Sequence, residues 1–128
     1  MNVATAAGEV AELRRQRREL RRELARVRWW RRLIAARHDL TLASLTLPDT
    51  IATDDGETAW HALAADAPTA LELGGAVWPD VHDVTVADLD VLDALDTRLD
   101  GYERRLSATL DTVTAHMVDA MGRVHQAQ

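Results

Sequence analysis

Residues 21–40 read RRELARVRWWRRLIAARHDL, and this stretch holds two of the four tryptophans and seven of the fifteen cationic residues of the chain. In and around it, eight residues follow one another at alternating steps of four and three: Leu13, Arg17, Leu20, Leu24, Val27, Arg31, Ile34 and His38. This is the heptad spacing of a helix that packs lengthwise against another helix. The stretch therefore predicts a coiled coil.

Three polar residues, Arg17, Arg31 and His38, interrupt this apolar seam. A charged group on such a seam costs free energy unless it is paired or reaches water. We expect Arg17 to lay its stem along the seam and keep its charged head in water. Arg31 also shares a helical face with Arg28 and Asp39, where guanidinium and carboxylate groups could bind a planar, anionic ligand such as a nucleotide.

The spacing of helix formers and breakers predicts two long helices. The first should span residues 8–45, because Pro48 ends any continuation. The second should span residues 85–125, with Thr85 and Asp88 as a capping pair at its start and Gly101 as a weak point. Its apolar residues recur at helical spacing: Leu92, Leu95, Leu99, Tyr102, Leu106, Leu110, Val113, Met117, Ala120, Met121 and Val124.

Two long helices with a connector between them most simply form an antiparallel hairpin. We therefore predict a single all-α domain over residues 1–128: an antiparallel two-helix coiled-coil hairpin with a partly helical connector, residues 46–84. Within the connector we expect a short helix over residues 56–65 and a helical turn over residues 69–73. Trp78 is expected to pack onto the long helices.

The net charge of −6 conceals an asymmetry along the chain. Residues 1–40 carry eleven arginines and five acids (+6), whereas residues 41–128 carry four arginines and sixteen acids (−12). Oppositely charged halves attract each other when folded together, so this asymmetry is ordinary complementarity between two helices. Direct binding of the arginine-rich helix to nucleic acid is a weaker interpretation, because the overall charge repels phosphate.

Several classes of function are disfavoured by what the chain lacks. It has no cysteine, no phosphate-binding loop, no nucleophile elbow and no pair of histidines at a zinc-binding spacing. We therefore expect no enzyme, no metal site and no required cofactor. Without a signal sequence or a long apolar stretch, we expect a soluble, cytoplasmic protein with no membrane partner.

Two stretches resemble RsiG-type proteins, the actinobacterial anti-sigma factors that hold a sporulation-type sigma factor in a complex dependent on cyclic di-GMP. Members of this family have often been labelled aerial mycelium formation proteins. The stretches are RRELARVRWWRRLIAARHDL and YERRLSATLDTVTAHMVDAMGRV, which together make up about one third of the chain. The connector contributes nothing to this resemblance.

The family's ligand motif is a Glu followed by Ser, Arg, Gln and Asp at steps of four, three, four and four, present on both helices. Arg31 and Asp39 match it on the first helix, and Glu103 and Ser107 match it on the second. The other positions depart from the motif: Leu24, Arg28 and Ala35 on the first helix, and Leu110, Thr114 and Val118 on the second. Neither copy is intact, and no Gln is retained.

The resemblance implies a cyclic di-GMP site formed by Arg28, Arg31, Asp39, Glu103 and Ser107. Arginine can stack on guanine or bind its O6 and N7, a carboxylate can accept its N–H groups, and Arg28 in place of serine could still contact phosphate. The departures leave two alternatives open: the site is lost, or a homodimer assembles one from the retained halves. A register that brought Asp39 beside Glu103 would make two carboxylates repel.

Two functions follow as alternatives. The resemblance implies an anti-sigma-type regulatory protein that binds a sigma factor of the sporulation or flagellar type, gated by cyclic di-GMP, with Trp29 and Trp30 as candidate partner-binding residues. The alternative is a structural or self-associating coiled-coil module without a small-molecule ligand. A co-expressed sigma factor would form a complex with the first and not with the second.

Overall fold

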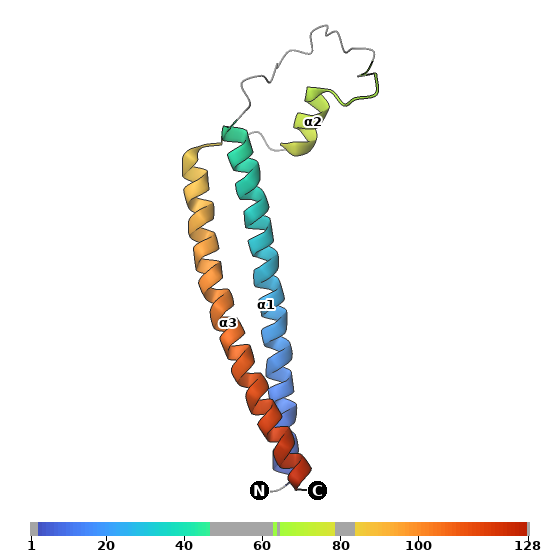
Figure 1. The fold of residues 1–128 in the computed structure, drawn as a ribbon, viewed down its shortest axis with the longest axis vertical. Coiled ribbons are helices and arrows are strands. Elements are labelled where there is room, and N and C mark those ends of the chain that lie inside the picture. Colours follow the sequence, from blue (N-terminus) through green and yellow to red (C-terminus); the bar gives the residue numbers. More distant parts are fainter. Residues whose placement is uncertain (1–2, 47–62, 64, 79–83, 128) are drawn as a thin grey trace.

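The computed structural model describes residues 3–46, 63, 65–78 and 84–127, and its regular structure is entirely helical there. Helix α1 spans Val3–Leu45, α2 spans Ala70–Val77 and α3 spans Val86–Gln126. Figure 1 shows α1 and α3 side by side along their lengths, with the start of α1 and the end of α3 at one tip and α2 beyond the other tip. The predicted antiparallel two-helix hairpin is confirmed.

Ion pairs fix one register from end to end. Glu9 pairs with Arg123 near the chain termini, Arg28 pairs with Glu103 in the middle, and His38 contacts Asp93 near the connector. As the position on α1 moves toward the connector, the partner on α3 moves by nearly the same number of residues toward its N-terminus. The predicted attraction between a basic α1 and an acidic α3 thus acts across the helix pair.

The seam of α1 begins earlier than the sequence analysis predicted. Helix α1 starts at Val3 rather than near residue 8, and Ala6 and Val10 are buried. These two residues continue the alternation of four and three steps back from Leu13, so the first turns also have an apolar face to place against α3.

The centre of the core is a cluster of Leu24, Val27 and Leu106, and four partly buried residues pack around it: Leu20, Leu99, Tyr102 and Leu110. On α3 the buried seam is narrower than the predicted apolar stripe, because Leu95 and Met121 are exposed. A two-helix hairpin covers one stripe on each helix, and apolar residues beside that stripe remain at the surface.

Helix α3 starts as the capping pair predicted, since the Asp88 carboxylate accepts the backbone N–H of Thr85 at 2.8 Å. Gly101 does not interrupt the helix. A methyl group added there would lie 3.4 Å from the end of the flexible Arg105 side chain. The prediction of a weak point at Gly101 is therefore not reflected in the helix geometry.

The described part of the connector contains α2, which replaces the predicted turn over residues 69–73 with a longer helix. Thr69 and Glu72 form a reciprocal capping box at its start. The predicted helix over residues 56–65 lies almost entirely outside the described residues. Trp78 meets the hairpin as expected, because its indole N–H donates to the hydroxyl of Ser44 on α1 at 3.1 Å.

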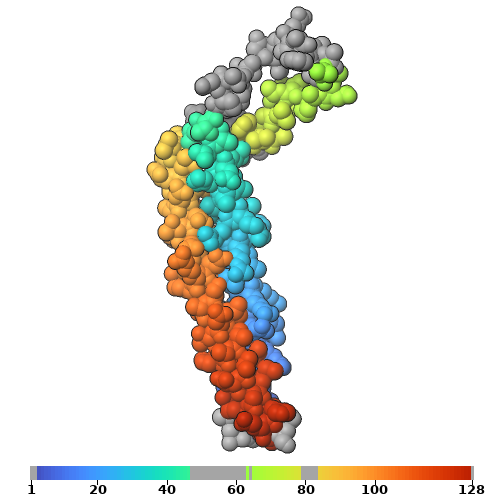
Figure 2. Space-filling model, viewed as in Figure 1, coloured from blue at the N-terminus to red at the C-terminus, as the bar shows by residue number. Residues whose placement is uncertain are grey.

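Figure 2 shows the hairpin as a long, narrow rod. Within the described ranges, no helix combines the length and the apolar character that crossing a lipid bilayer requires.

Candidate functional site

Arg31 lies on the helix seam and is surrounded by carboxylates from α3. Its Nε and Nη2 donate to the two carboxylate oxygens of Asp96 at 3.0 and 3.3 Å, and its Nη1 donates to Glu103 at 2.6 Å. Asp100 adds a third carboxylate at 3.3 Å from Nη1. The Arg31 side chain keeps 28% of its surface exposed, so this network is only partly shielded from water. We call Arg31, Asp96, Asp100 and Glu103 the Arg31 cluster.

Arg28 extends this network on the same flank of the hairpin. Its Nε donates to the second oxygen of Glu103 at 2.9 Å, so Glu103 bridges two guanidinium groups. The hydrogen bonds from Arg28 and Arg31 hold the pKa of Glu103 below its ordinary value. The hydrogen bonds to Asp96 and Glu103 raise the pKa of Arg31. Opposite charges that stabilise each other in this way favour the ionised forms of Glu103 and Arg31.

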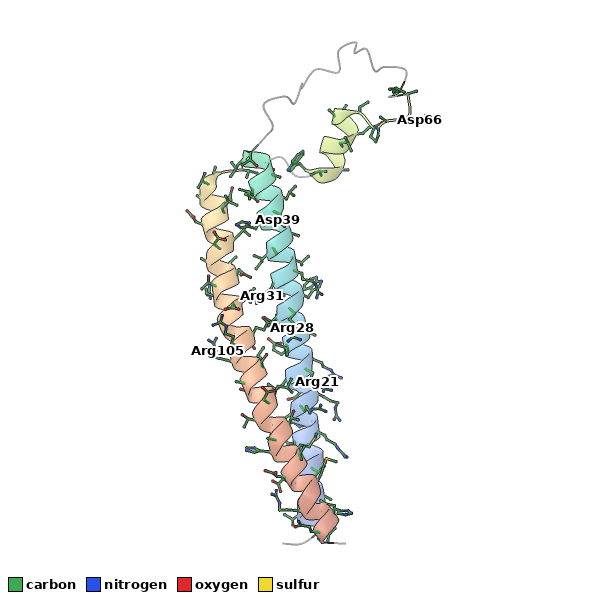
Figure 3. The ribbon with its side chains drawn as sticks, viewed as in Figure 1. Arg21, Arg28, Arg31, Asp39, Asp66 and Arg105 are labelled. Carbon is green, nitrogen blue, oxygen red and sulfur yellow. The ribbon has the colours of Figure 1, made fainter. Side chains whose placement is uncertain are left out.

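The structure brings together only part of the residue set that the resemblance implied. Arg28, Arg31 and Glu103 are in contact, and Figure 3 shows Arg28 and Arg31 beside α3 while Asp39 lies closer to the connector. Ser107 lies one turn beyond Glu103 on the same flank of α3, partly buried. Asp39 lines a hollow of about 420 Å³ whose walls also include Arg31 and Asp96.

The register keeps Asp39 and Glu103 apart. Glu103 is level with Arg28, and eleven residues of helix from Arg28 to Asp39 correspond to about 16 Å along the axis. The condition under which the two carboxylates would repel each other is thus not met. The Glu103 carboxylate binds Arg28 and Arg31 instead. Asp39 lies beside the stretch of α3 that holds Leu92 and Asp93.

Asp96 and Asp100 are cluster members that the sequence analysis did not identify. The signal was available, because Asp96 and Glu103 continue the alternating three and four steps set by Leu92, Leu99 and Leu106. An acidic residue at a seam position opposite a seam arginine indicates a cross-helix ion pair. Only the register says which arginine meets which acid.

The opposite flank of the hairpin carries a second candidate surface, which we call the aromatic flank. Its hollow of about 770 Å³ lies between the helices, with apolar and aromatic walls formed by Trp30, Ile34, Leu95, Leu99 and Tyr102. Three arginines, Arg26, Arg98 and Arg105, also line it.

The two candidate partner-binding tryptophans are both exposed at the surface. Trp29 and Trp30 expose 46% and 44% of their surface, and their rings meet edge to face with centroids 4.7 Å apart. Only Trp30 lines the aromatic flank. Such exposed aromatic area is more than packing within one hairpin requires.

Hydrogen bonds to Glu23 fix two residues that line the aromatic flank, Arg26 and Tyr102. Glu23 accepts hydrogen bonds from Arg26 and from the Tyr102 hydroxyl, the latter at 2.9 Å. These donors, Arg26 first, lower the pKa of Glu23 to about 2, and the same contact raises the pKa of Tyr102. Arg105 lies 5.9 Å from the centre of the Tyr102 ring, within cation–π range.

Arg17 matches the prediction only in part. Its side chain is half-buried, as expected for a stem that lies along the seam. Its Nε is buried without a hydrogen-bond partner among the described residues, whereas the outer guanidinium nitrogens are not buried in this way. Arg17 occupies the same heptad position as Arg31, so the seam contains one arginine with carboxylate partners and one without.

Comparisons of the chain with protein-family models, with curated proteins and with solved structures find no match. The resemblance to RsiG-type proteins therefore rests on the two quoted stretches alone and stays a prediction.

Proposed function

We propose that this hairpin is an anti-sigma-type regulatory protein that binds a sigma factor of the sporulation or flagellar type through its aromatic flank. The observation that carries the proposal is the hollow between the helices, in which Trp30 and Tyr102 stand beside arginines. Tryptophan, tyrosine and arginine are the residues that most often dominate the binding energy of protein interfaces. The sigma factor as partner comes from the resemblance of the two helices to RsiG-type proteins.

The charge of the aromatic flank favours a different protein over a second copy of this chain. Arg98 and Arg105 line the hollow together with Arg26, and Glu23 is engaged by Arg26. Two copies that met through this flank would bring arginines against arginines, which costs free energy. A partner with acidic side chains around an apolar centre would instead be complementary.

Binding to a co-expressed sigma factor tests this proposal. We expect a stable complex by affinity capture and light scattering, and a loss of affinity of roughly thirtyfold for Trp30→Ala, equivalent to about 2 kcal/mol. Val118→Ala is a matched control, because Val118 is an exposed apolar residue on the opposite flank of α3. It should leave affinity unchanged.

If no sigma factor binds and the purified chain forms dimers or larger assemblies, the self-associating module is the better description. An equal loss of affinity in Trp30→Ala and Val118→Ala would contradict the assignment of the aromatic flank.

We further propose that cyclic di-GMP gates this complex at the Arg31 cluster. Arg28 and Arg31 stand side by side there with Glu103, the donor and acceptor types that a guanine nucleotide needs. In the free hairpin these arginines already bind carboxylates, and Asp96 and Asp100 would repel phosphate. The nucleotide would therefore have to replace carboxylates as partners of Arg31, which couples its binding to the contact between α1 and α3.

Calorimetric titration with cyclic di-GMP, with and without the sigma factor, tests the gate. We expect saturable binding that Arg31→Ala abolishes. Absence of heat in both titrations would reject nucleotide control while leaving sigma-factor binding as a separate question.

A further inference from the structure

We propose that Arg14, Arg17, Arg18 and Arg21 form a binding site for a short oligophosphate chain in the half of the hairpin that carries the chain termini. The four guanidinium-bearing side chains, with Met117 and Met121 of α3, line a hollow of about 390 Å³. From Arg14 to Arg21 the backbone advances two helical turns, or about 10 Å. We call this the arginine groove.

Arg17 supplies the clearest sign that the groove is incomplete by itself. Its Nε is the buried side-chain nitrogen or oxygen without a hydrogen-bond partner among the described residues. A buried donor without a partner destabilises a fold, and native proteins retain few of them. An anion in the groove would accept from this guanidinium.

The other three arginines of the groove are also available to a ligand. Within the part of the chain that the structure describes, none of the four forms an ion pair, unlike Arg15, Arg28, Arg31, Arg104 and Arg123. The nearby acids of α1, Glu12 and Glu19, are held by Arg15. Asp111 of α3, level with Arg21, is exposed and has no ion-pair partner among the residues that the structure describes.

The chemistry of the groove favours several phosphate groups over one. A guanidinium is planar and presents paired N–H groups that match phosphate oxygens, and four of them within two turns can neutralise several negative charges. The volume of the hollow lies within the range of small-molecule sites.

The surroundings limit the length of the ligand. Toward the connector, the seam of α3 carries Asp96, Asp100 and Glu103, whose charges repel a long polyanion that follows the rod. The net charge of the chain, −6, acts in the same direction. These repulsions favour a free oligophosphate over a nucleic-acid backbone.

The test is a titration of the full chain with inorganic tripolyphosphate at physiological ionic strength, followed by calorimetry and by the NMR signals of the arginine Nε–H groups. We expect saturable binding, with the largest signal change at Arg17 Nε–H. Arg17→Leu should weaken binding at least about tenfold, although it raises the melting temperature by placing leucine on the seam. Arg18→Gln should also weaken binding.

Arg22→Gln is the charge-matched control, because Arg22 is exposed on the same helix and does not line the groove. It should change tripolyphosphate affinity by less than about twofold. The proposal is overturned if Arg22→Gln and Arg18→Gln lose affinity equally, or if no saturable binding occurs. Tighter binding of a polyglutamate peptide would reassign the groove to an acidic protein segment, and tighter binding of a single-stranded oligonucleotide would reassign it to nucleic acid.

Discussion

Arg31 and Arg17 stand two heptads apart at the same position of the α1 seam, yet they have opposite surroundings. Arg31 meets three carboxylates of α3, from Asp96, Asp100 and Glu103. Two heptads further along α3, the corresponding positions hold residues without charge: Leu110, Thr114 and Met117. Identical residues at equivalent positions of one helix thus become an ion-pair centre and an unsatisfied donor, because α3 offers carboxylates at one level and none at the corresponding positions of the other.

The two arginines differ in whether contacts within the hairpin compensate the cost of placing a charge in the seam. At Arg31 the cross-helix contacts compensate the cost of partial burial and hold one register, since a shift of α3 would separate the partners. At Arg17 no hydrogen bond to Nε from the described residues compensates this cost. A residue that breaks a local rule without a compensating contact is where a function is expected, and this motivates the arginine groove.

The largest effect should come from removing the satisfied arginine. Arg31→Leu leaves Asp96 without its arginine, and Glu103 and Asp100 then keep only Arg28 and Arg104 as partners. We therefore expect a loss of about 2–3 kcal/mol in the free energy of unfolding. Urea denaturation followed by circular dichroism measures it. If Arg31→Leu is instead more stable, the ion pairs of the Arg31 cluster contribute less to the free energy of unfolding than the desolvation of their charges costs.

The same substitution in the other heptad should act in the opposite direction. Arg17→Leu removes a buried unsatisfied donor and adds apolar area to the seam, so we expect a gain of about 1–2 kcal/mol in unfolding free energy. The measurement is the same denaturation series. If Arg17→Leu and Arg31→Leu both destabilise to a similar degree, the contrast between the two heptads is wrong.

A carboxylate partner for Arg17 can be introduced at the α3 position that corresponds to Glu103. Met117 stands where Glu103 stands two heptads earlier, so Met117→Glu should pair with Arg17 and stabilise the hairpin by about 1 kcal/mol at neutral pH. In an Arg17→Leu background the same change should destabilise, because the new carboxylate has lost its partner. A double-mutant cycle measures the coupling, and a coupling energy near zero would contradict the shared geometry.

The smallest expected effect is the pH dependence of the stability that Glu103 contributes through the Arg31 cluster. Because Arg28 and Arg31 lower the pKa of Glu103, its contribution is present above the ordinary carboxylate pKa and is lost as pH falls through the lowered one. We expect the free energy of unfolding of the unsubstituted protein to exceed that of Glu103→Gln by about 1 kcal/mol at pH 7. This difference should shrink below about pH 4.

Unfolding measured from pH 7 to pH 2 follows this loss. The gain from Arg17→Leu should stay constant over the same range, since Arg17 Nε has no hydrogen-bond partner, and so no carboxylate partner, among the described residues. A gain that varied with pH in parallel with the Glu103 effect would show that the two heptads are not independent.

The heptad spacing of α1 made the hairpin predictable. It identified the seam from Leu13 to His38, and the capping pair Thr85 and Asp88 marked the start of α3. The upstream extension through Ala6 was missed because small residues give a weak apolar signal. On α3 the wider stripe that included Leu95 was predicted because periodicity alone does not separate the centre of a seam from its edge.

The candidate site was less accessible from sequence. Arg28, Arg31 and Glu103 were predicted as site residues, and they do come together. The contact of Arg31 with Asp96 was not predicted, because it depends on how α1 and α3 are aligned along each other. The separation of Asp39 from Glu103 depends on the same register. The arginine groove was not predicted, because Arg17 was considered by itself and not together with Arg14, Arg18 and Arg21.

The sequence by itself determined two long amphipathic helices and the reversal between them, because helical periodicity, capping and proline act over a few neighbouring residues. It also determined that α1 is basic and α3 acidic. Only the tertiary structure decided that Arg31 is paired and Arg17 is not. Pairing requires two groups within a few ångströms, and the residues of α3 that provide or withhold the carboxylates reach that distance only when the hairpin closes in one register.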